Sequence, residues 1–270
     1  MLKRRNYSKS MKILILTTYY NRPKLLQKAM TSILEANQYH SDWELVFGDD
    51  NSPIPGEPIV RKVLSTCNNQ ITCINSHMSF EDKVEQGLVI GRYANEVIQK
   101  SDADIAITLC DDDCLVPTYL RDISQFFETH PHYMWAYSHL AIYNPIYQKP
   151  ENIDLTDIKE CSYNEYTTSI NPINKLDSSQ VAFRLKVFKE GVRYPENSKI
   201  SEEDLMPWLI NPDAFLFQEM YKRYGKIPFT NLISQYKGIH EHQLVWHKKQ
   251  GHAGLKEYVD RINDLGGDLL

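Results

Sequence analysis

Asp104-Ile-Ala-Ile-Thr-Leu-Cys-Asp-Asp-Asp-Cys-Leu-Val-Pro117 is the stretch of sequence that decides the fold. Its first half is largely apolar and predicts a buried strand over Asp104–Leu109. The strand runs into Asp111, Asp112 and Asp113, and a helix is predicted over Pro117–His130. A strand, a polar turn and a helix in this order form part of a βαβ unit.

The same alternation of strand and helix occupies the chain on both sides of this stretch. Further strands are predicted at Ile13–Leu16, Trp43–Phe47, Ile71–Ile74 and Tyr133–Leu140. Helices are predicted over Asp82–Gln99 and after Asn21, which we expect to cap its helix with Pro23 in the first turn, and Pro53–Pro58 is a predicted loop. The fold class is therefore α/β, with a doubly wound, mostly parallel sheet flanked by helices.

The second half of the chain has a less regular pattern. Residues Asn152–Ile173 are polar and predict a loop-rich segment, and apolar segments resume at Val181–Phe188 and Ala214–Tyr221. We therefore expect a less regular C-terminal lobe.

Composition excludes several classes of protein. A chain of 270 residues with 42% hydrophobic residues is long enough for one large domain. The formal net charge of -5 gives no electrostatic reason to expect nucleic acid as a partner. The five cysteines lack a paired CxxC framework, which favours a reducing cytoplasmic location. No apolar run approaches the roughly 20 residues of a transmembrane helix.

Three polar clusters follow predicted strands, at Thr17–Asn21, Asp49–Ser52 and Asp111–Asp113. Ligands of open α/β sheets bind beyond the carboxyl ends of the strands. The fold is therefore expected to bring all three clusters to one edge of the sheet.

The acidic cluster Asp111–Asp113 predicts a cation site. Three adjacent carboxylates repel one another unless a cation compensates them. Their hard oxygens suit Mn²⁺ or Mg²⁺, and such an ion acts as a Lewis acid on a departing diphosphate. The alternative is a solvated acidic turn.

The cluster Asp49–Ser52 has two interpretations. A carboxylate at a strand end can accept a hydrogen bond from a uracil imide or a ribose hydroxyl. The alternative is an Asx-turn that closes the junction between strand and loop.

As a set, these segments resemble glycosyltransferase family 2, which has the GT-A fold. The resemblance rests on Leu16-Thr-Thr-Tyr-Tyr-Asn-Arg22, Glu44-Leu-Val-Phe-Gly-Asp-Asp-Asn-Ser52 and Leu109–Pro117, in that order. Phe127-Glu-Thr-His-Pro131 and Trp135-Ala-Tyr-Ser138 also resemble this family, in particular its bacterial spore-coat polysaccharide members. The resemblance implies an inverting transferase with a nucleotide-sugar donor, a glycan or other hydroxyl acceptor, and a divalent cation.

The resemblance also implies roles for individual residues on the donor side. Residues matching the nucleotide-binding positions are Thr18, Tyr20, Asp50, Arg92 and Asp111, with Lys83 as the alternative to Arg92. Asp112 matches the metal ligand, Asp113 falls on an acidic position of many relatives, and Cys110 stands where many relatives carry Asp. His242, or His240, would complete the metal shell or contact phosphate.

On the acceptor side, the resemblance implies a general base late in the chain. The segment Asn211-Pro-Asp213-Ala-Phe-Leu-Phe217 matches the element that carries it, so Asp213 is the candidate catalytic base. The acidic cluster Ser201–Asp204 is the competing candidate, and an ordinary capping role is the alternative for Asp213.

These assignments divide the chain into four segments. Residues 1–10 form a basic tail, with a membrane-surface anchor as the alternative, and residues 11–118 form the half that binds the nucleotide sugar. Residues 119–245 form the acceptor-side half, and residues 246–270 a C-terminal tail or helix.

Two other functions compete with the transferase. A sugar nucleotidyltransferase also binds nucleotide and metal at a sheet edge, but Thr17–Arg22 lacks the Gly-rich phosphate loop expected of one. A non-catalytic nucleotide-sugar-binding module would not depend on Asp213.

Overall fold

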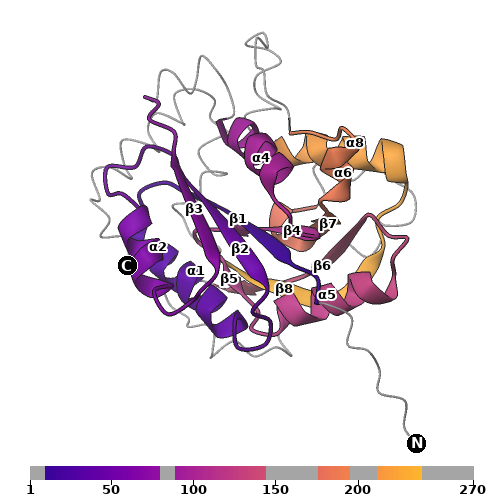
Figure 1. Ribbon diagram of the computed structural model, residues 1–270, viewed down its shortest axis with the longest axis horizontal. Coiled ribbons are helices and arrows are strands. Elements are labelled where there is room, and N and C mark those ends of the chain that lie inside the picture. The colour runs from indigo at the N-terminus through magenta and orange to yellow at the C-terminus, as the bar shows by residue number, and fades with distance from the viewer. Residues whose placement is uncertain (1–9, 80–88, 144–175, 195–211, 239–270) are drawn as a thin grey trace, which may run out of the picture.

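The computed structural model describes residues 10–79, 89–143, 176–194 and 212–238, and all statements below concern these residues. They form one eight-stranded sheet with helices on both faces (Figure 1). In chain order, the strands are β1 (Ile13–Tyr19), β2 (Trp43–Asp49), β3 (Gln70–Asn75), β4 (Ile105–Cys110), β5 (Cys114–Leu115), β6 (Trp135–Tyr143), β7 (Val181–Arg184) and β8 (Phe229–Gly238). The helices are α1 (Pro23–Ala36), α2 (Glu57–Val63), α4 (Val89–Lys100), α5 (Tyr119–Thr129), the 3₁₀ helix η4 (Ser178–Gln180), α6 (Lys186–Lys189) and α8 (Pro212–Tyr224).

The sheet has the order β3-β2-β1-β4-β7-β6-β8-β5. Strands β3, β2, β1 and β4 are parallel, as the pattern of apolar runs predicts. Strand β7 is antiparallel to both β4 and β6, β8 is parallel to β6, and β5 is antiparallel to β8. The predicted α/β class is therefore confirmed, with antiparallel strands in the second half of the sheet.

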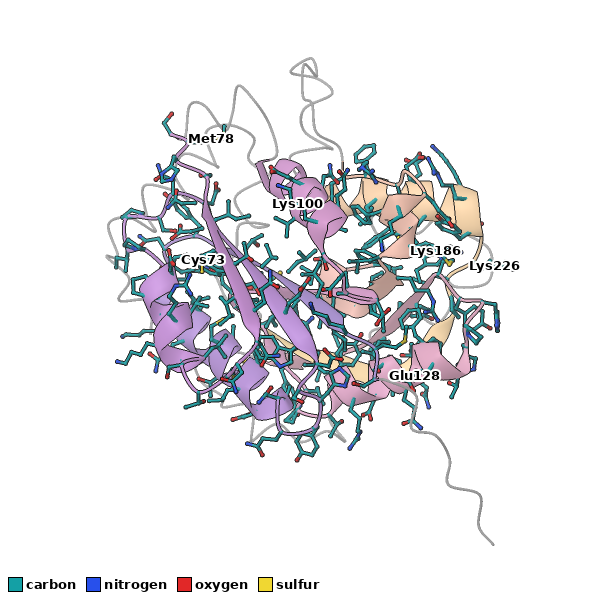
Figure 2. The ribbon with its side chains drawn as sticks, viewed as in Figure 1. Cys73, Met78, Lys100, Glu128, Lys186 and Lys226 are labelled. Carbon is teal, nitrogen blue, oxygen red and sulfur yellow. The ribbon has the colours of Figure 1, made fainter. Side chains whose placement is uncertain are left out.

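Alternate residues of β1 show why an uninterrupted apolar run predicts a central strand. Ile13 and Ile15 belong to the core under α1, α2 and α5, whereas Leu14 and Leu16 belong to the core under α4, α6 and α8. Figure 1 shows these two groups of helices on opposite faces of the sheet. Charged side chains such as Lys100 and Glu128 lie on the outer surfaces of the two helix layers (Figure 2).

The prediction that Asn21 caps α1 is wrong. Arg22 occupies the N-cap position and makes no side-chain capping bond, while Pro23 lies in the first turn as predicted. Asn21 has a left-handed backbone with a φ of 48° and is fully buried. Its amide N–H donates to Ser52 Oγ at 3.0 Å, and its Oδ1 accepts from the amide of Ile54 at 3.3 Å. Asn21 therefore joins two loops at the sheet edge instead of capping a helix.

The predicted loop at Pro53–Pro58 is correct only in its first part, because α2 begins at Glu57. Pro58 fits the first turn of that helix, where its missing N–H is not needed.

Strands β5, β7 and β8 were not predicted. β5 and β7 are two and four residues long, and β8 carries polar residues along much of its length. Their strand character comes from pairing with neighbours distant in the sequence.

Two predicted elements lie partly or wholly outside the described residues. The helix predicted over Asp82–Gln99 is described from Val89 onward, as α4. The loop-rich segment predicted over Asn152–Ile173 is outside the described part of the chain.

Gly56 is required by the packing of two aromatic rings. A Cβ atom at this position would lie 2.4 Å from Phe47 Cζ and 2.7 Å from Tyr19 Cδ1. Both rings are buried and cannot move without disturbing the core. At Gly48, by contrast, the nearest atom to an added Cβ is 3.8 Å away, which is an ordinary contact.

We therefore predict that Gly56→Ala lowers the free energy of unfolding by about 1–3 kcal/mol, because it overpacks the core beneath the loop between β2 and α2. The matched substitution Gly48→Ala should change this free energy by less than about 1 kcal/mol. Urea denaturation of both variants, followed by circular dichroism, provides the measurement. Equal stability of the two variants would contradict the prediction.

Candidate active site at the carboxyl ends of the strands

The three polar clusters meet at one edge of the sheet, as predicted. β1, β2 and β4 are in register, with Thr18 aligned with both Gly48 and Cys110. The amide of Asp50 donates to the carbonyl of Tyr19 at 3.0 Å, and the amide of Tyr20 donates to Asp111 Oδ2 at 3.3 Å. The ends of the three strands are therefore linked by direct hydrogen bonds.

Asp49 and Asp50 have different surroundings. The Asp49 carboxylate is buried and accepts hydrogen bonds from the amides of Ser52 and Gly56, both at 2.8 Å. Asp49 therefore organises the loop through the amides three and seven residues further on, and not through the amide two residues on that an Asx-turn uses. Asp50 and Thr18 are partly exposed at the same edge, as residues that contact a ligand must be.

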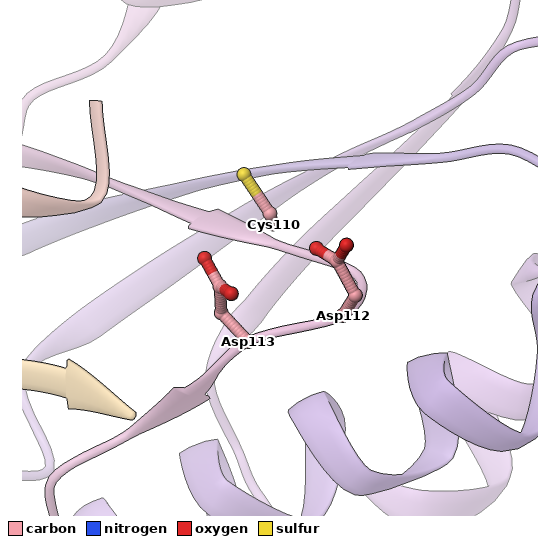
Figure 3. Close-up of side chains that lie close together, drawn as sticks. All are labelled: Cys110, Asp112 and Asp113. Atoms are coloured by element: carbon pink, nitrogen blue, oxygen red, sulfur yellow. The ribbon is translucent and has the colours of Figure 1, made fainter. Parts of the chain in front are cut away.

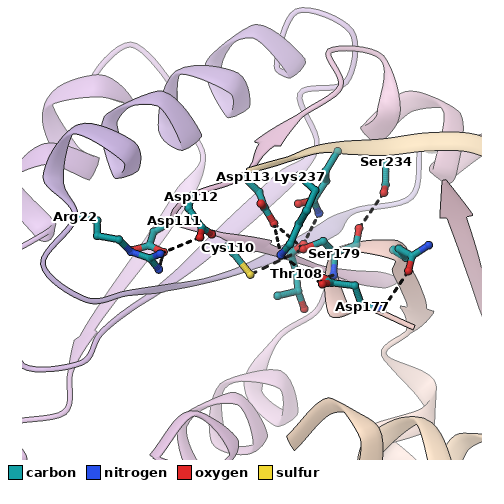
Figure 4. A network of polar contacts seen from close by, with 12 residues as sticks. Arg22, Thr108, Cys110, Asp111, Asp112, Asp113, Asp177, Ser179, Ser234 and Lys237 are labelled. Atoms are coloured by element: carbon teal, nitrogen blue, oxygen red, sulfur yellow. Dashed lines mark hydrogen bonds and ion pairs between the residues drawn. The ribbon is translucent and has the colours of Figure 1, made fainter. Parts of the chain in front are cut away.

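Arg22 binds two carboxylates of the acidic turn. Its Nη1 lies 2.8 Å from Asp112 Oδ2, its Nε donates to Asp111 Oδ2 at 3.2 Å, and its Nη2 forms an ion pair with Asp111 Oδ1 (Figure 4). Sequence analysis assigned no role to Arg22. The need of adjacent carboxylates for compensation is the signal that could have identified this neighbouring cation.

Asp113 belongs to a second group of contacts. Its Oδ2 accepts a hydrogen bond from Ser179 Oγ at 2.8 Å and pairs with Lys237 Nζ at 3.1 Å. Lys237 Nζ also lies 3.4 Å from Asp177 Oδ2, so the lysine bridges two carboxylates (Figure 4). Sequence analysis did not predict Ser179, Asp177 and Lys237 as site residues, because their contacts join the acidic turn to segments far along the chain.

Burial raises the pKa values of the acidic turn. It raises the pKa of Asp111 to about 7 even though Arg22 favours the ionised form. It likewise raises the pKa of Asp113 to about 7 against the effect of Lys237. Burial also raises the pKa of the Cys110 thiol well above its usual value. For Lys237, burial disfavours the charged form, but Asp113 and its acidic neighbours hold the pKa well above normal.

The side chains around the turn fit a divalent cation. Ligand atoms of Cys110, Asp112 and Asp113 lie within 4.8 Å of one another, and Figure 3 shows them close together. Among the described residues, the cations beside the carboxylates of Asp111, Asp112, Asp113 and Asp177 are Arg22 and Lys237. The carboxylate oxygens of the turn are the hard ligands that a divalent ion prefers.

The other predicted site residues are distributed as follows. Asp213 lies in the first turn of α8 and is partly exposed, and Arg92 lies on α4. His242, His240, Lys83 and the competing cluster Ser201–Asp204 lie outside the described residues.

Tyr194 is a buried residue that contacts β4, and sequence analysis did not identify it. Asn95 Nδ2 donates to the Tyr194 carbonyl and the Tyr194 amide donates to Asn95 Oδ1, both at 2.9 Å. Burial chiefly raises the pKa of the Tyr194 hydroxyl, and the charge of Asp213 raises it further, while a hydrogen bond with Thr108 opposes the shift. The charge of Asp213 therefore acts on a tyrosine that contacts β4, the strand leading to the acidic turn.

Residues 14–190 match the sequence profile of Glycosyl transferase family 2, which is more than half of the chain. The chain belongs to glycosyl transferase family 2. The resemblance of the three strand-end motifs is thus confirmed at the level of the family. No helix in the described part of this family 2 chain is long and apolar enough to cross a membrane.

Among curated proteins, the chain is similar to Protein CgeD of Bacillus subtilis (strain 168), with 32% identity over 130 residues. The match covers 47% of this chain and 29% of CgeD, so it spans less than a third of that relative.

Solved structures share the GT-A fold of the family. The chain is similar to S. aureus TarS 1-349 in complex with UDP-GlcNAc, with a TM-score of 0.57, 17% identity, and coverage of 96% of this chain and 68% of TarS 1-349. It is also similar to the mannosyltransferase PcManGT from Pyrobaculum calidifontis in complex with GDP-Man and Mn²⁺. There the TM-score is 0.57 and the identity 12%, with coverage of 96% of this chain and 70% of PcManGT.

We predict that Arg22→Met lowers the free energy of unfolding by about 3–5 kcal/mol, because it leaves two buried carboxylates without their cation. Urea denaturation at neutral pH measures the loss. The matched control is Arg61→Met, which breaks the exposed ion pair with Glu57 and should stay near wild type. Similar losses in both variants would contradict the prediction.

Proposed function

We propose that this family 2 protein is an inverting glycosyltransferase that moves a sugar from a nucleoside diphosphate, most simply a UDP-sugar, to a hydroxyl of a glycan or another acceptor. The observation that carries the proposal is the meeting of Asp50, Tyr20 and the Asp111–Asp113 turn at the linked ends of β1, β2 and β4. This is the edge of an α/β sheet at which nucleotides bind.

The donor would lie against residues 11–118. Asp50 and Thr18 are partly exposed there and would contact the nucleoside, with Tyr20 beside Asp111 at the ribose. A carboxylate at Asp50 can accept the imide N–H of uracil, which favours UDP over other nucleotides. Arg92 on α4 would face the diphosphate.

The proposed cofactor is Mn²⁺ or Mg²⁺, held by Asp112 with Asp113 as the second candidate and His242 as a third. When bound, the ion would neutralise charge on the departing diphosphate. The oxygen donors gathered at the turn support this proposal. Arg22 holds Asp111 and Asp112 in place beside the donor.

Residues 119–245 would form the acceptor side. Asp213 would accept the proton of the acceptor hydroxyl as its oxygen attacks the anomeric carbon, and the bond from that carbon to the diphosphate would break. Attack from the face opposite the leaving group inverts the anomeric configuration. The partial exposure of Asp213 in the first turn of α8 supports its access to an acceptor.

Relatives support the donor class. TarS 1-349 is described in complex with UDP-GlcNAc, and PcManGT with GDP-Man and Mn²⁺. We extend a nucleotide-sugar donor from them to this chain. A cytoplasmic location is proposed because its cysteines lack a paired CxxC framework. A screen of nucleotide sugars for Mn²⁺-dependent hydrolysis tests the activity directly. Release of pyrophosphate instead of nucleoside diphosphate would indicate a nucleotidyltransferase.

We predict that Asp112→Asn weakens UDP binding in the presence of Mn²⁺ by about 10–100-fold, the usual cost of a lost metal contact. Without Mn²⁺, the variant and the wild type should bind UDP with similar, weak affinity. Isothermal titration calorimetry measures both. Asp102→Asn, on an exposed carboxylate, is the control and should bind as the wild type does. Equal wild-type affinity with and without Mn²⁺ would contradict the metal assignment.

For the base, we predict that Asp213→Asn lowers the transfer rate by about 10²–10⁴-fold, the usual contribution of a general base. Its affinity for UDP and Mn²⁺ should remain that of the wild type. The parallel variant Asp204→Asn tests the competing cluster. Loss of transfer in Asp204→Asn alone would assign the base to that cluster, and unchanged transfer in both variants would exclude both candidates.

A further inference from the structure

Asp113 differs from Asp112 in its surroundings. Asp113 is 0% exposed and its Oδ2 is shared by Ser179 and Lys237, whereas Asp112 is 6% exposed and contacts Arg22. The hydroxyl and the ammonium group together occupy both lone pairs of Asp113 Oδ2, so an ion at this oxygen would displace one of them. The two neighbouring carboxylates are therefore not equivalent as ligands.

The groups that hold Asp113 are themselves held in place. Asp177 accepts from the amide of Ser179 at 2.9 Å and completes a capping box with Gln180. Ser234 Oγ donates to the carbonyl of Ser179 at 2.9 Å, which ties η4 to β8. Lys237, on the same strand β8, is held between Asp113 and Asp177.

The acidic turn depends on β8 for its position. It leads into β5, which has only two residues and pairs with β8 through Cys114 with Tyr236 and Leu115 with Gln235. The amide of Val116 donates to the carbonyl of Ser234 at 3.1 Å. The ion pair between Lys237 and Asp113 joins the same two segments, the turn before β5 and strand β8, through side chains.

We propose that Asp113, Ser179 and Lys237 are positioning residues that fix the turn so that Asp112 presents its carboxylate to the ion. The inference rests on the proposed function and assigns the ligating role to Asp112. Lys237 compensates the negative charge of the buried Asp113 carboxylate. The turn is therefore ordered before an ion binds beside Asp112. Ordering of the turn then costs no binding energy when the ion arrives.

Two alternatives make opposite predictions for Lys237. If Asp113 were an ion ligand and Lys237 only competed for it, removal of the ammonium group would tighten Mn²⁺ binding, because a repelling charge disappears. If Lys237 bound the donor phosphate directly, its removal would weaken UDP binding, and the effect would add to that of an Asp113 variant.

The test is a double-mutant cycle on the full chain with Lys237→Met, Asp113→Asn and the double variant. Mn²⁺ affinity is measured by electron paramagnetic resonance of the free ion, with and without UDP. Each single substitution should weaken Mn²⁺ binding by about tenfold, and the double variant should be no weaker than either, because both remove the same contact. Lys237→Arg should restore most of the affinity, since it keeps the charge.

Lys222→Met is the matched control, because it removes an ion-paired but exposed lysine, and its Mn²⁺ affinity should stay that of the wild type. Thermal unfolding of each variant confirms that it folds. Ser179→Ala should reproduce part of the loss if Lys237→Met does not fold. Tighter Mn²⁺ binding by Lys237→Met, additive losses, or unchanged affinity would each overturn the inference and leave the proposed function intact. Absence of Mn²⁺ binding by the wild type would instead refute the proposed metal site, and the inference with it.

Discussion

Compensation of the buried acidic turn by two cations is the constraint on which the site depends. Asp111 and Asp113 are almost completely buried, and burial raises their pKa values to about 7 despite their partners. Arg22 arrives from the end of β1, and Lys237 from β8 on the other side of the turn. An unpaired buried charge would lower the stability of the fold, so both contacts are needed. Together they connect the acidic turn to β1 in the parallel half of the sheet and to β8 in the mixed half.

The same turn is also where possible metal ligands gather. Ligand atoms of Cys110, Asp112 and Asp113 lie within 4.8 Å of one another. Within the turn, Asp111 and Asp112 contact Arg22, whereas Asp113 contacts Lys237.

The parallel half of the fold could be predicted because its information is local. Ile13–Leu16 is apolar on both faces, and a strand buried on both faces is the arrangement that satisfies it. The meeting of Tyr20, Asp50 and Asp111 followed from the rule that ligands bind at the carboxyl ends of such strands. Asn21 was misread because a cap and a left-handed loop residue use the same residue type, and only its contacts with Ser52 and Ile54 separate the two.

By itself, the sequence determined the family, the α/β class and the edge of the sheet where the polar clusters gather, since each depends on short segments read in order. Only the tertiary structure decided that β5, β7 and β8 are strands. It also decided that Arg22 pairs with Asp111 and Asp112 while Lys237 pairs with Asp113. It also separated the structural carboxylate Asp49 from its neighbour Asp50. These features depend on contacts between residues up to 124 positions apart, as between Lys237 and Asp113, and local patterns carry no information on such pairings.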